Sequence, residues 1–369
     1  MSASASFASS SFELADLGWD EAWAVTMGTA VQLHGSAEPG RVARVDLGAC
    51  TVIGTAGAGR ATVTPGTTVT VGDWVLVRES VVLGALPRRT AIVRRSAGHA
   101  DGAAATAQTL AANVDTVLIL VAADGRVTPR SIERYVALVW ESGAVPVVVL
   151  TKADLVSGDE LDEAVERLEP ACSPYGRQVN LPNLHVISVP TGAGLDALAP
   201  YFGRGRTVAL LGSSGAGKST LTNHLAGAEV LATGAVRDDD RRGRHTTTHR
   251  ELVVLPGGGV LIDSPGLREI GLWQGDEGIA RTFPEITELL DQCRFADCSH
   301  RREPGCAVLA ALADGRISEE RLASWRKLRR ELDRLAARDD PALREQLRTE
   351  QRRFYREYAQ ARKDWKKRR

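Results

Sequence analysis

The sequence predicts a multidomain protein that combines a small β-barrel, an α/β domain and a helical C-terminal domain. Over residues 28–100, apolar and polar residues alternate between turn residues, which is typical of short strands. Over residues 101–275, short apolar runs alternate with helical stretches. That pattern favours a largely parallel sheet covered by helices on both faces. Residues 276–369 are mainly helical in pattern and strongly charged, and a cluster of cysteines and a histidine interrupts them.

The charge is balanced overall but not along the chain. The 369 residues carry 46 basic and 46 acidic side chains, so the net charge is zero. Residues 326–369 hold 17 Lys or Arg against 8 Asp or Glu, a local excess of +9 that leaves −9 for the rest. The zero sum therefore does not exclude a nucleic-acid partner. An apolar content of 43% excludes a wholly disordered chain.

Targeting and redox features point to the cytoplasm. No apolar run approaches the roughly 18 residues that span a bilayer, so we expect no membrane association. The first residues contain no basic n-region, and we expect residues 1–27 to form a disordered tail rather than a signal peptide. Three of the five cysteines are crowded into residues 293–306, which argues against a disulfide framework.

The first folded region reads as a β-barrel. The stretches RVARVDLGACTVIG and TTVTVGDWVLV alternate, and Pro65 and Gly66 mark a turn between them. Several short strands within residues 28–100 fit a Greek-key barrel such as an OB-fold. An SH3-like barrel or a simple β-extension remains as the alternative.

A phosphate-binding loop is the strongest motif. The pattern G-x-x-x-x-G-K-[ST] follows an apolar strand and opens a helical stretch, as the motif requires. Its glycines allow backbone amides to surround phosphate oxygens, Lys218 would bridge the β- and γ-phosphates, and the Ser219 hydroxyl would bind Mg²⁺. A chance Gly/Ser loop is the alternative. The predicted nucleotide-binding residues here are Gly212, Ser213, Ser214, Gly215, Ala216, Gly217, Lys218, Ser219 and Thr220.

A D-x-x-G motif follows the strand VLID. Asp263 could hold Mg²⁺, and Gly266 would leave room for the γ-phosphate. The motif is short, and a turn after a strand would explain it equally well in isolation. Its position after the phosphate loop favours the nucleotide interpretation.

A third loop is suited to reading guanine. Thr151, Lys152 and Asp154 follow the strand VPVVVL. A carboxylate at Asp154 can accept hydrogen bonds from N1 and the exocyclic N2 of guanine, a donor pair that adenine lacks, so it would reject ATP. The Lys152 stem would lie along the base, and the backbone at Ser188 and Val189 could contact the guanine oxygen. An N-cap role for Asp154 is the alternative.

The order of these motifs is permuted. In Ras-like GTPases the phosphate loop comes first, whereas here the base-reading loops precede it. A permutation keeps the folded site but moves the termini, so the chain after residue 270 follows directly on the part that responds to hydrolysis.

With these residues in place, the chain resembles the circularly permuted GTPases of the RsgA/YjeQ type. The matching segments are TKAD, GSSGAGKSTL, GRHTTTHREL, DSPGLREIGLW, VGDWV, LPRRTAIVRR and the Cys/His cluster. The resemblance implies an OB-fold barrel, a permuted GTPase domain and a zinc-binding helical C-terminal domain. It also implies a monomeric enzyme that hydrolyses GTP to GDP, is stimulated by the small (30S) ribosomal subunit, and acts late in that subunit's maturation through binding of its 16S rRNA.

The residue that orients the attacking water must lie outside the D-x-x-G motif and the position directly after it. Leu267 stands where many GTPases have a glutamine, and it cannot hydrogen-bond water. By resemblance, His245 is the catalytic histidine, acting with Lys218, and Thr247 is the switch residue that contacts Mg²⁺. A solvent-exposed loop role for His245 is the alternative. The spacing of His245 and His249 also fits a metal site, but the intervening threonines make a poor helix.

Four candidate metal ligands lie close together in the C-terminal region. Three thiolates and one imidazole would close a tetrahedral site around one structural zinc per chain and leave no position for catalysis. A chance cluster is the alternative. Arg294, Arg301 and Arg302 lie among the ligands and suit phosphate contacts. The ligands are Cys293, Cys298, His300 and Cys306.

Aromatic residues are scattered through the basic tail. They could stack on unpaired RNA bases, or they could pack on the Cys/His cluster. These residues are Trp325, Phe354, Tyr355, Tyr358 and Trp365.

Two further functions remain open for the whole chain: an RNA-binding module with a degenerate nucleotide site, and an ATPase. The intact Lys218, Ser219, Asp263 and Asp154 argue against the first, and Asp154 argues against the second.

Overall fold

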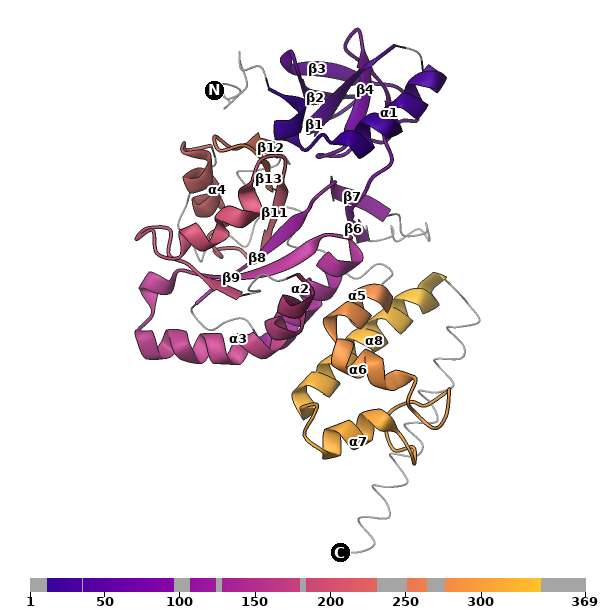
Figure 1. Cartoon of the computed structure of the whole chain (residues 1–369), viewed down its shortest axis with the longest axis vertical. Helices are drawn as coiled ribbons and strands as arrows, with labels where there is room; N and C mark the ends of the chain where they lie inside the picture. The colour runs from indigo at the N-terminus through magenta and orange to yellow at the C-terminus, as the bar shows by residue number, and fades with distance from the viewer. Residues whose placement is uncertain are drawn as a thin grey trace, which may run out of the picture. The chain divides into compact units, whose positions relative to one another are not determined.

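The computed structural model describes residues 12–34, 36–95, 107–123, 128–179, 184–230, 251–263 and 276–339. Their contacts group residues 12–94 and 107–263 into one unit and residues 276–339 into a second. Figure 1 shows the elements of both units along the chain.

The first unit begins with a closed five-stranded barrel. Its strand order is β1-β2-β3-β5-β4, and β4 pairs back onto β1. β3 and β5 are parallel while the other pairs are antiparallel. This is the Greek-key arrangement of an OB-fold and confirms that prediction over the SH3-like alternative. The strands are β1 (Glu38–Asp46), β2 (Ala49–Gly54), β3 (Gly57–Val63), β4 (Trp74–Arg78) and β5 (Val81–Ala85).

The prediction of a disordered tail over residues 1–27 is wrong from Leu14 onward. A 3-10 helix, Leu14–Leu17, and α1 (Glu21–His34) occupy this segment. Leu17 and Trp23 are buried, and the Trp19 ring lies edge-on against Trp74 of the barrel at a centroid distance of 4.7 Å. The small and polar residues at the start of the chain obscured the spacing of these apolar residues. Because α1 extends to His34, the first barrel strand begins at Glu38 and not near residue 28.

The α/β part contains five parallel strands in the order β10-β9-β8-β11-β13, with β12 antiparallel at their edge. This confirms the predicted largely parallel sheet. The strands are β8 (Thr116–Ala122), β9 (Val145–Thr151), β10 (Leu184–Val186), β11 (Thr207–Gly212), β12 (Glu251–Val254) and β13 (Val260–Asp263). A separate two-stranded sheet, β6 (Ala91–Arg95) with β7 (Ala107–Ala112), precedes them.

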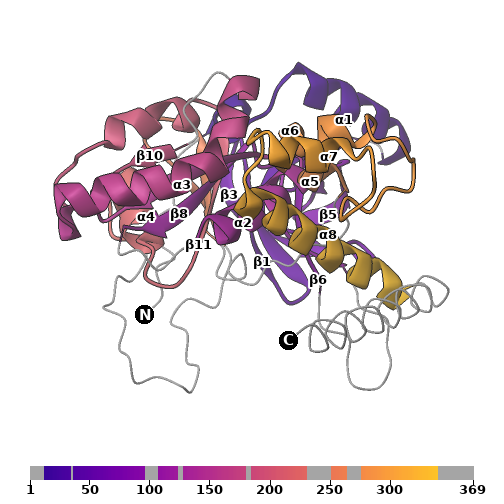
Figure 2. The ribbon, with the colours of Figure 1, turned by 90° about the horizontal axis from the view of Figure 1, so that it is seen from below.

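Three helices accompany the parallel sheet. α2 (Pro129–Glu141) packs on β8 and β9, and α3 (Gly158–Val179) runs beside α2 (Figure 2). α4 (Lys218–Ala226) packs on β11 and β13. Pro129 lies in the first turn of α2 and the Thr128 side chain caps that helix, as expected for a helix start.

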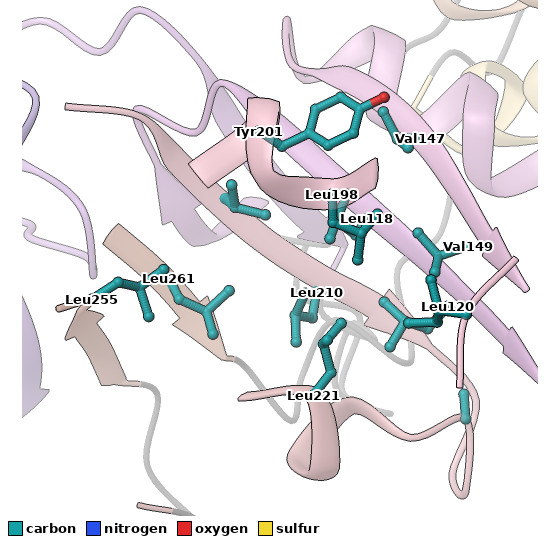
Figure 3. Packing of buried hydrophobic residues seen from close by; sticks show 13 residues of the cluster. Leu118, Leu120, Val147, Val149, Leu198, Tyr201, Leu210, Leu221, Leu255 and Leu261 are labelled. Atoms are coloured by element: carbon teal, nitrogen blue, oxygen red, sulfur yellow. The ribbon is translucent and has the colours of Figure 1, made fainter. Parts of the chain in front are cut away.

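One face of the sheet is held by an aliphatic core (Figure 3). Alternate residues of neighbouring strands share this face, because side chains in a strand point to opposite faces in turn. Leu198 and Tyr201 of the 3-10 helix Leu195–Phe202 and Leu221 of α4 cover it. The strand residues in this core include Leu118, Leu120, Val147, Val149, Leu210 and Leu261.

A buried arginine joins the barrel, the N-terminal segment and the α/β part. Arg41 of β1 is 1% exposed, and burial lowers its pKa to about 10. Its guanidinium donates to the carbonyl oxygens of Gly72, Leu17 and Asn113 and to the Thr207 hydroxyl. Strand β1 also pairs with β12 at Arg44 and Glu251, so the two sheets are continuous.

The segments VGDWV and LPRRTAIVRR pack at the same junction. Asp73 is fully buried and pairs with Arg88, with Nε 2.7 Å from Oδ1. Arg89 binds Asp20 of the N-terminal segment through both carboxylate oxygens at 2.5 and 2.6 Å. The hydrogen bond from Arg89 lowers the pKa of Asp20 to about 2, so this carboxylate is ionised at neutral pH.

The second unit is helical, as predicted. It contains α5 (Asp276–Thr282), α6 (Pro284–Leu290), α7 (Ala307–Ala313) and α8 (Glu319–Asp339). Arg321 of α8 binds the Glu285 carboxylate and the Thr282 carbonyl, each at 2.6 Å. Among the described residues, none of the helices has the length and apolar character to span a bilayer.

Replacing the buried arginine should destabilise the first unit. We expect Arg41→Met to lower the free energy of unfolding by about 3 kcal/mol or more, because three buried carbonyls lose their donor. Denaturant unfolding measures this change. Arg44→Met on the same strand is the control: its side chain is 30% exposed and pairs with Asp46, so a loss below about 1 kcal/mol is expected. Equal losses for both variants would contradict the role of Arg41.

Candidate functional site

The phosphate loop connects the buried strand β11 to α4. Gly212 ends β11, and a Cβ added there would lie 2.4 Å from the Leu120 carbonyl oxygen of β8. Gly217 caps α4 with a φ of 86°, in the left-handed region that favours glycine. The loop therefore has the strand–loop–helix setting that places backbone amides at a helix N-terminus.

The lysine of the loop points into it. Lys218 is buried, and its ammonium donates to the carbonyl oxygens of Gly212 and Ser213 at 2.9 and 2.7 Å. Ser219 is half-buried, whereas Ser213, Ser214 and Thr220 are exposed. A cation held over the loop's concave backbone is suited to bind phosphate oxygens.

Thr151 lies behind the phosphate loop rather than at its surface. It is the last residue of β9, and it is 3% exposed. Its hydroxyl donates to the Ala216 carbonyl of the loop at 2.9 Å and contacts the Val121 carbonyl of β8 at 3.2 Å. Thr151 is predicted to bind nucleotide, and its hydroxyl is shared between these two backbone oxygens. Thr151 therefore supports the predicted nucleotide-binding loop from behind.

The residues predicted to read the base come from two neighbouring strand ends. The Ser188 hydroxyl, which is 2% exposed, donates to Oδ1 of Asp154 at 2.6 Å. Backbone bonds from Ile187 to Leu150 and from Ala153 to Ile187 set the distance between the two loops. Because Ser188 holds one carboxylate oxygen, the other can accept from a ligand.

Asp154 does not cap a helix. It lies in the 3-10 helix Ala153–Leu155, and α3 begins only at Gly158. Lys152 adopts a φ of 61° at the start of this turn. The Val189 side chain packs against the core, so its backbone rather than its side chain is available to a ligand.

Asp263 ends β13, which runs parallel to β11. Carboxyl ends of parallel strands lie at the same edge, so Asp263, Gly212, Thr151 and Ser188 gather at one edge of the sheet. The other predicted residues of this site, His245, Thr247 and Gly266, lie outside the described residues.

The Cys/His cluster has the geometry of a tetrahedral metal site. The four ligand atoms of Cys293, Cys298, His300 and Cys306 all lie within 4.8 Å of one another. The Cys293 and Cys306 sulfurs are 3.9 Å apart, and each is 3.5 Å from Nδ1 of His300. Tetrahedral zinc bonds of ordinary length place sulfurs about 3.8 Å apart and sulfur about 3.6 Å from nitrogen. Burial lowers the pKa of His300, which favours the neutral imidazole a metal requires.

The surroundings of the cluster are organised by hydrogen bonds. Glu303 accepts from the backbone amides of Ser299, Arg301 and Arg302, and bonds from Ser299 hold its pKa well below the usual range. Trp325 is 7% exposed, and its ring lies edge-on to His300 at 5.7 Å. Trp325 thus packs on the cluster, while Phe354, Tyr355, Tyr358 and Trp365 lie outside the described residues.

The hydroxyl of Thr151 should matter for nucleotide affinity. We expect Thr151→Val to weaken GDP binding about fivefold to tenfold, or about 1 kcal/mol, because two buried carbonyls at the loop lose their donor. Calorimetric titration with GDP measures this. Thr151→Ser keeps the hydroxyl and should stay within twofold of the parent protein. Unchanged affinity in Thr151→Val would show that the loop does not depend on this bond.

Comparison with known proteins identifies the family. A family model described as RsgA GTPase matches residues 85–273. A protein of Streptomyces avermitilis named small ribosomal subunit biogenesis GTPase RsgA is 46% identical over 357 residues, covering 93% of this chain and 92% of that protein. A protein of Opitutus terrae with the same name is 45% identical over 356 residues, covering 89% and 92%.

Solved structures share the architecture. The crystal structure of YjeQ from Thermotoga maritima has a TM-score of 0.61 and 25% identity, covering 80% of this chain and 99% of that one. YloQ, described as a circularly permuted GTPase, has a TM-score of 0.56 and 21% identity, covering 81% and 96%, and shows the fold. The family match over half the chain and the close relatives over most of it confirm the resemblance, and the chain belongs to the RsgA family of circularly permuted GTP hydrolases.

Proposed function

We propose that this GTP hydrolase acts in late maturation of the small ribosomal subunit, that the subunit stimulates its turnover, and that it binds the subunit through 16S rRNA. The observation that carries the nucleotide part is the Asp154–Ser188 pair at the same sheet edge as the phosphate loop. The names of the close relatives support the ribosomal part.

At the nucleotide site, each residue has a role that depends on its position. The amides of the loop and Lys218 bind the β- and γ-phosphates, and Asp154 accepts from guanine. The Ser219 hydroxyl and the Asp263 carboxylate are the ligands that would hold Mg²⁺, which supplies charge neutralisation between the phosphates when bound. Gly266 of the D-x-x-G motif would leave room for the γ-phosphate.

The hydrolytic step needs a residue beyond the phosphate loop. We assign the orientation of the attacking water to His245, because Leu267 offers no hydrogen bond at the usual position. By the same resemblance, Thr247 would contact Mg²⁺ and the γ-phosphate. Both assignments rest on the segment GRHTTTHREL and its resemblance to the family.

The Cys/His cluster holds one structural zinc. The donor set and the sulfur–nitrogen distances support this ion, since three thiolates and an imidazole leave no open position for catalysis. The loop that carries these ligands also carries Arg294, Arg301 and Arg302, and residues 326–369 have a charge excess of +9. These basic groups are suited to bind rRNA phosphates. The resemblance to the RsgA/YjeQ family also supports a monomeric enzyme located in the cytoplasm.

Turnover measured with and without small ribosomal subunits tests the proposal. We expect added subunits to raise the GTP hydrolysis rate, and we expect that gain to fall as salt rises from 50 to 200 mM, since phosphate contacts release counterions. Large subunits are the control and should give no gain. Equal rates with and without small subunits would contradict the proposal, and salt-independent stimulation would contradict docking through rRNA phosphates.

Substitution of His245 should separate binding from hydrolysis. His245→Ala should bind GTP with unchanged affinity but lose subunit-stimulated turnover, because water orientation is lost while the phosphate loop is intact. Lys218→Ala should instead weaken nucleotide binding itself. Stimulated turnover at the parent rate in His245→Ala would remove His245 from the mechanism.

Elemental analysis tests the metal. The purified protein should contain one zinc per chain, and Cys298→Ser should contain much less and unfold its C-terminal unit more readily. Cys50→Ser is the control, because Cys50 lies in the barrel core far from the cluster in sequence. A full zinc complement in Cys298→Ser would contradict the assignment.

A further inference from the structure

A cavity lies at the edge of the parallel sheet opposite the nucleotide loops. Its volume is about 430 Å³, within the ~300–1,000 Å³ typical of small-molecule sites. Asn113, Val114 and Asp115 directly before β8 and Thr207 at the start of β11 line it, together with Arg89 and Thr90. Residues of the N-terminal segment complete the lining. None of these residues belongs to the nucleotide site.

One wall of the cavity is aromatic and rigid. Trp19 stacks with Trp23 at a centroid distance of 6.3 Å and an interplanar angle of 24°, and it rests edge-on against buried Trp74. The Arg89 guanidinium lies 4.2 Å from the Trp23 ring and is held there by Asp20. Trp19 itself is only half-buried, so it offers indole surface on which a flat ring can stack.

The cavity lining also offers a hydrogen-bond acceptor and a cationic donor. Oδ2 of Asp115 accepts from the Thr207 amide at 2.7 Å, which leaves Oδ1 for a ligand. Arg206 is the residue next to that amide, it lines the cavity, and its exposed side chain makes no hydrogen bond or ion pair to any described residue. Arg41, deeper in the cavity, has its donors committed to protein oxygens.

We propose that this cavity binds a guanine base, presented by a free guanine nucleotide or by an unpaired guanosine of RNA. The base would stack on Trp19, with N1–H and N2–H toward Asp115 and with O6 and N7 toward Arg206. Arginine paired with O6 and N7 is the commonest specific contact to guanine, and unpaired RNA bases are recognised by stacking on aromatic rings. Adenine lacks the N1–H donor, and pyrimidines lack N7. The site is separate from GTP hydrolysis and does not depend on it.

The test uses the full-length protein loaded with one equivalent of GDP and freed of excess GDP by gel filtration, so that the Asp154 site is filled and no free guanine nucleotide competes for the cavity. Fluorescent RNA pentamers AAGAA, AAAAA and UUUUU are titrated by anisotropy, and GMP is titrated by tryptophan fluorescence. We expect AAGAA to bind at least about tenfold more tightly than the other pentamers. GMP affinity equal to that of AAGAA would assign the site to free nucleotide, and weaker GMP affinity would assign it to RNA.

Two variants probe the recognition groups. Asp115→Asn keeps an oxygen for the Thr207 amide but replaces an acceptor with a donor, and Arg206→Ala removes the contact to O6 and N7. Each should lose about tenfold in AAGAA affinity while GDP affinity and melting temperature stay unchanged. Arg167→Ala removes one exposed positive charge from α3 and should bind like the parent protein. Equal affinity for AAGAA and AAAAA, or unchanged affinity in both Asp115→Asn and Arg206→Ala, would overturn the proposal.

Discussion

The function of this protein depends on the parallel arrangement of β10, β9, β8, β11 and β13. In a parallel sheet, every strand delivers its carboxyl end to the same edge, whatever the order of the strands along the chain. Four segments therefore meet at one edge. They are the loop after β9 that is predicted to read the base, the serine after β10, the phosphate loop after β11, and Asp263 at the end of β13. A permuted chain can build the same site because the sheet, not the sequence order, determines which loops are neighbours.

Two side-chain hydroxyls connect the loops at this edge. Thr151 ties β9 and β8 to the phosphate loop, and Ser188 ties the end of β10 to Asp154. Each hydroxyl is buried, so each bond is protected from competing water. These bonds connect the loops predicted to bind the phosphates and the base. Arg41 has the corresponding role at the opposite edge, where it joins the barrel and the N-terminal segment to the starts of the strands.

The strands, the phosphate loop and the metal ligands could be predicted because each has a local sequence signature. Strand alternation identified the barrel, and the spacing of Cys293, Cys298, His300 and Cys306 identified a cluster whose ligand atoms do lie together. The N-terminal segment could not be predicted, because Leu17 and Trp23 acquire their burial from Trp74 and Arg41, residues distant in sequence. For the same reason the buried position of Thr151 and the cavity beside Asp115 were not visible in the sequence. Both are formed by pairs of residues that only the sheet brings together.

Nucleotide selection by Asp154 is the central claim, and a change of base tests it directly. Asp154→Asn keeps Oδ1 for the Ser188 hydroxyl and replaces Oδ2 with an amide donor. Guanine presents a donor at the 2-position, whereas xanthine presents an acceptor there. The measurement is the affinity of the parent protein and of Asp154→Asn for GDP and for xanthosine diphosphate. The parent protein should prefer GDP and Asp154→Asn should prefer the xanthine nucleotide; a variant that still prefers GDP would contradict base reading by Asp154.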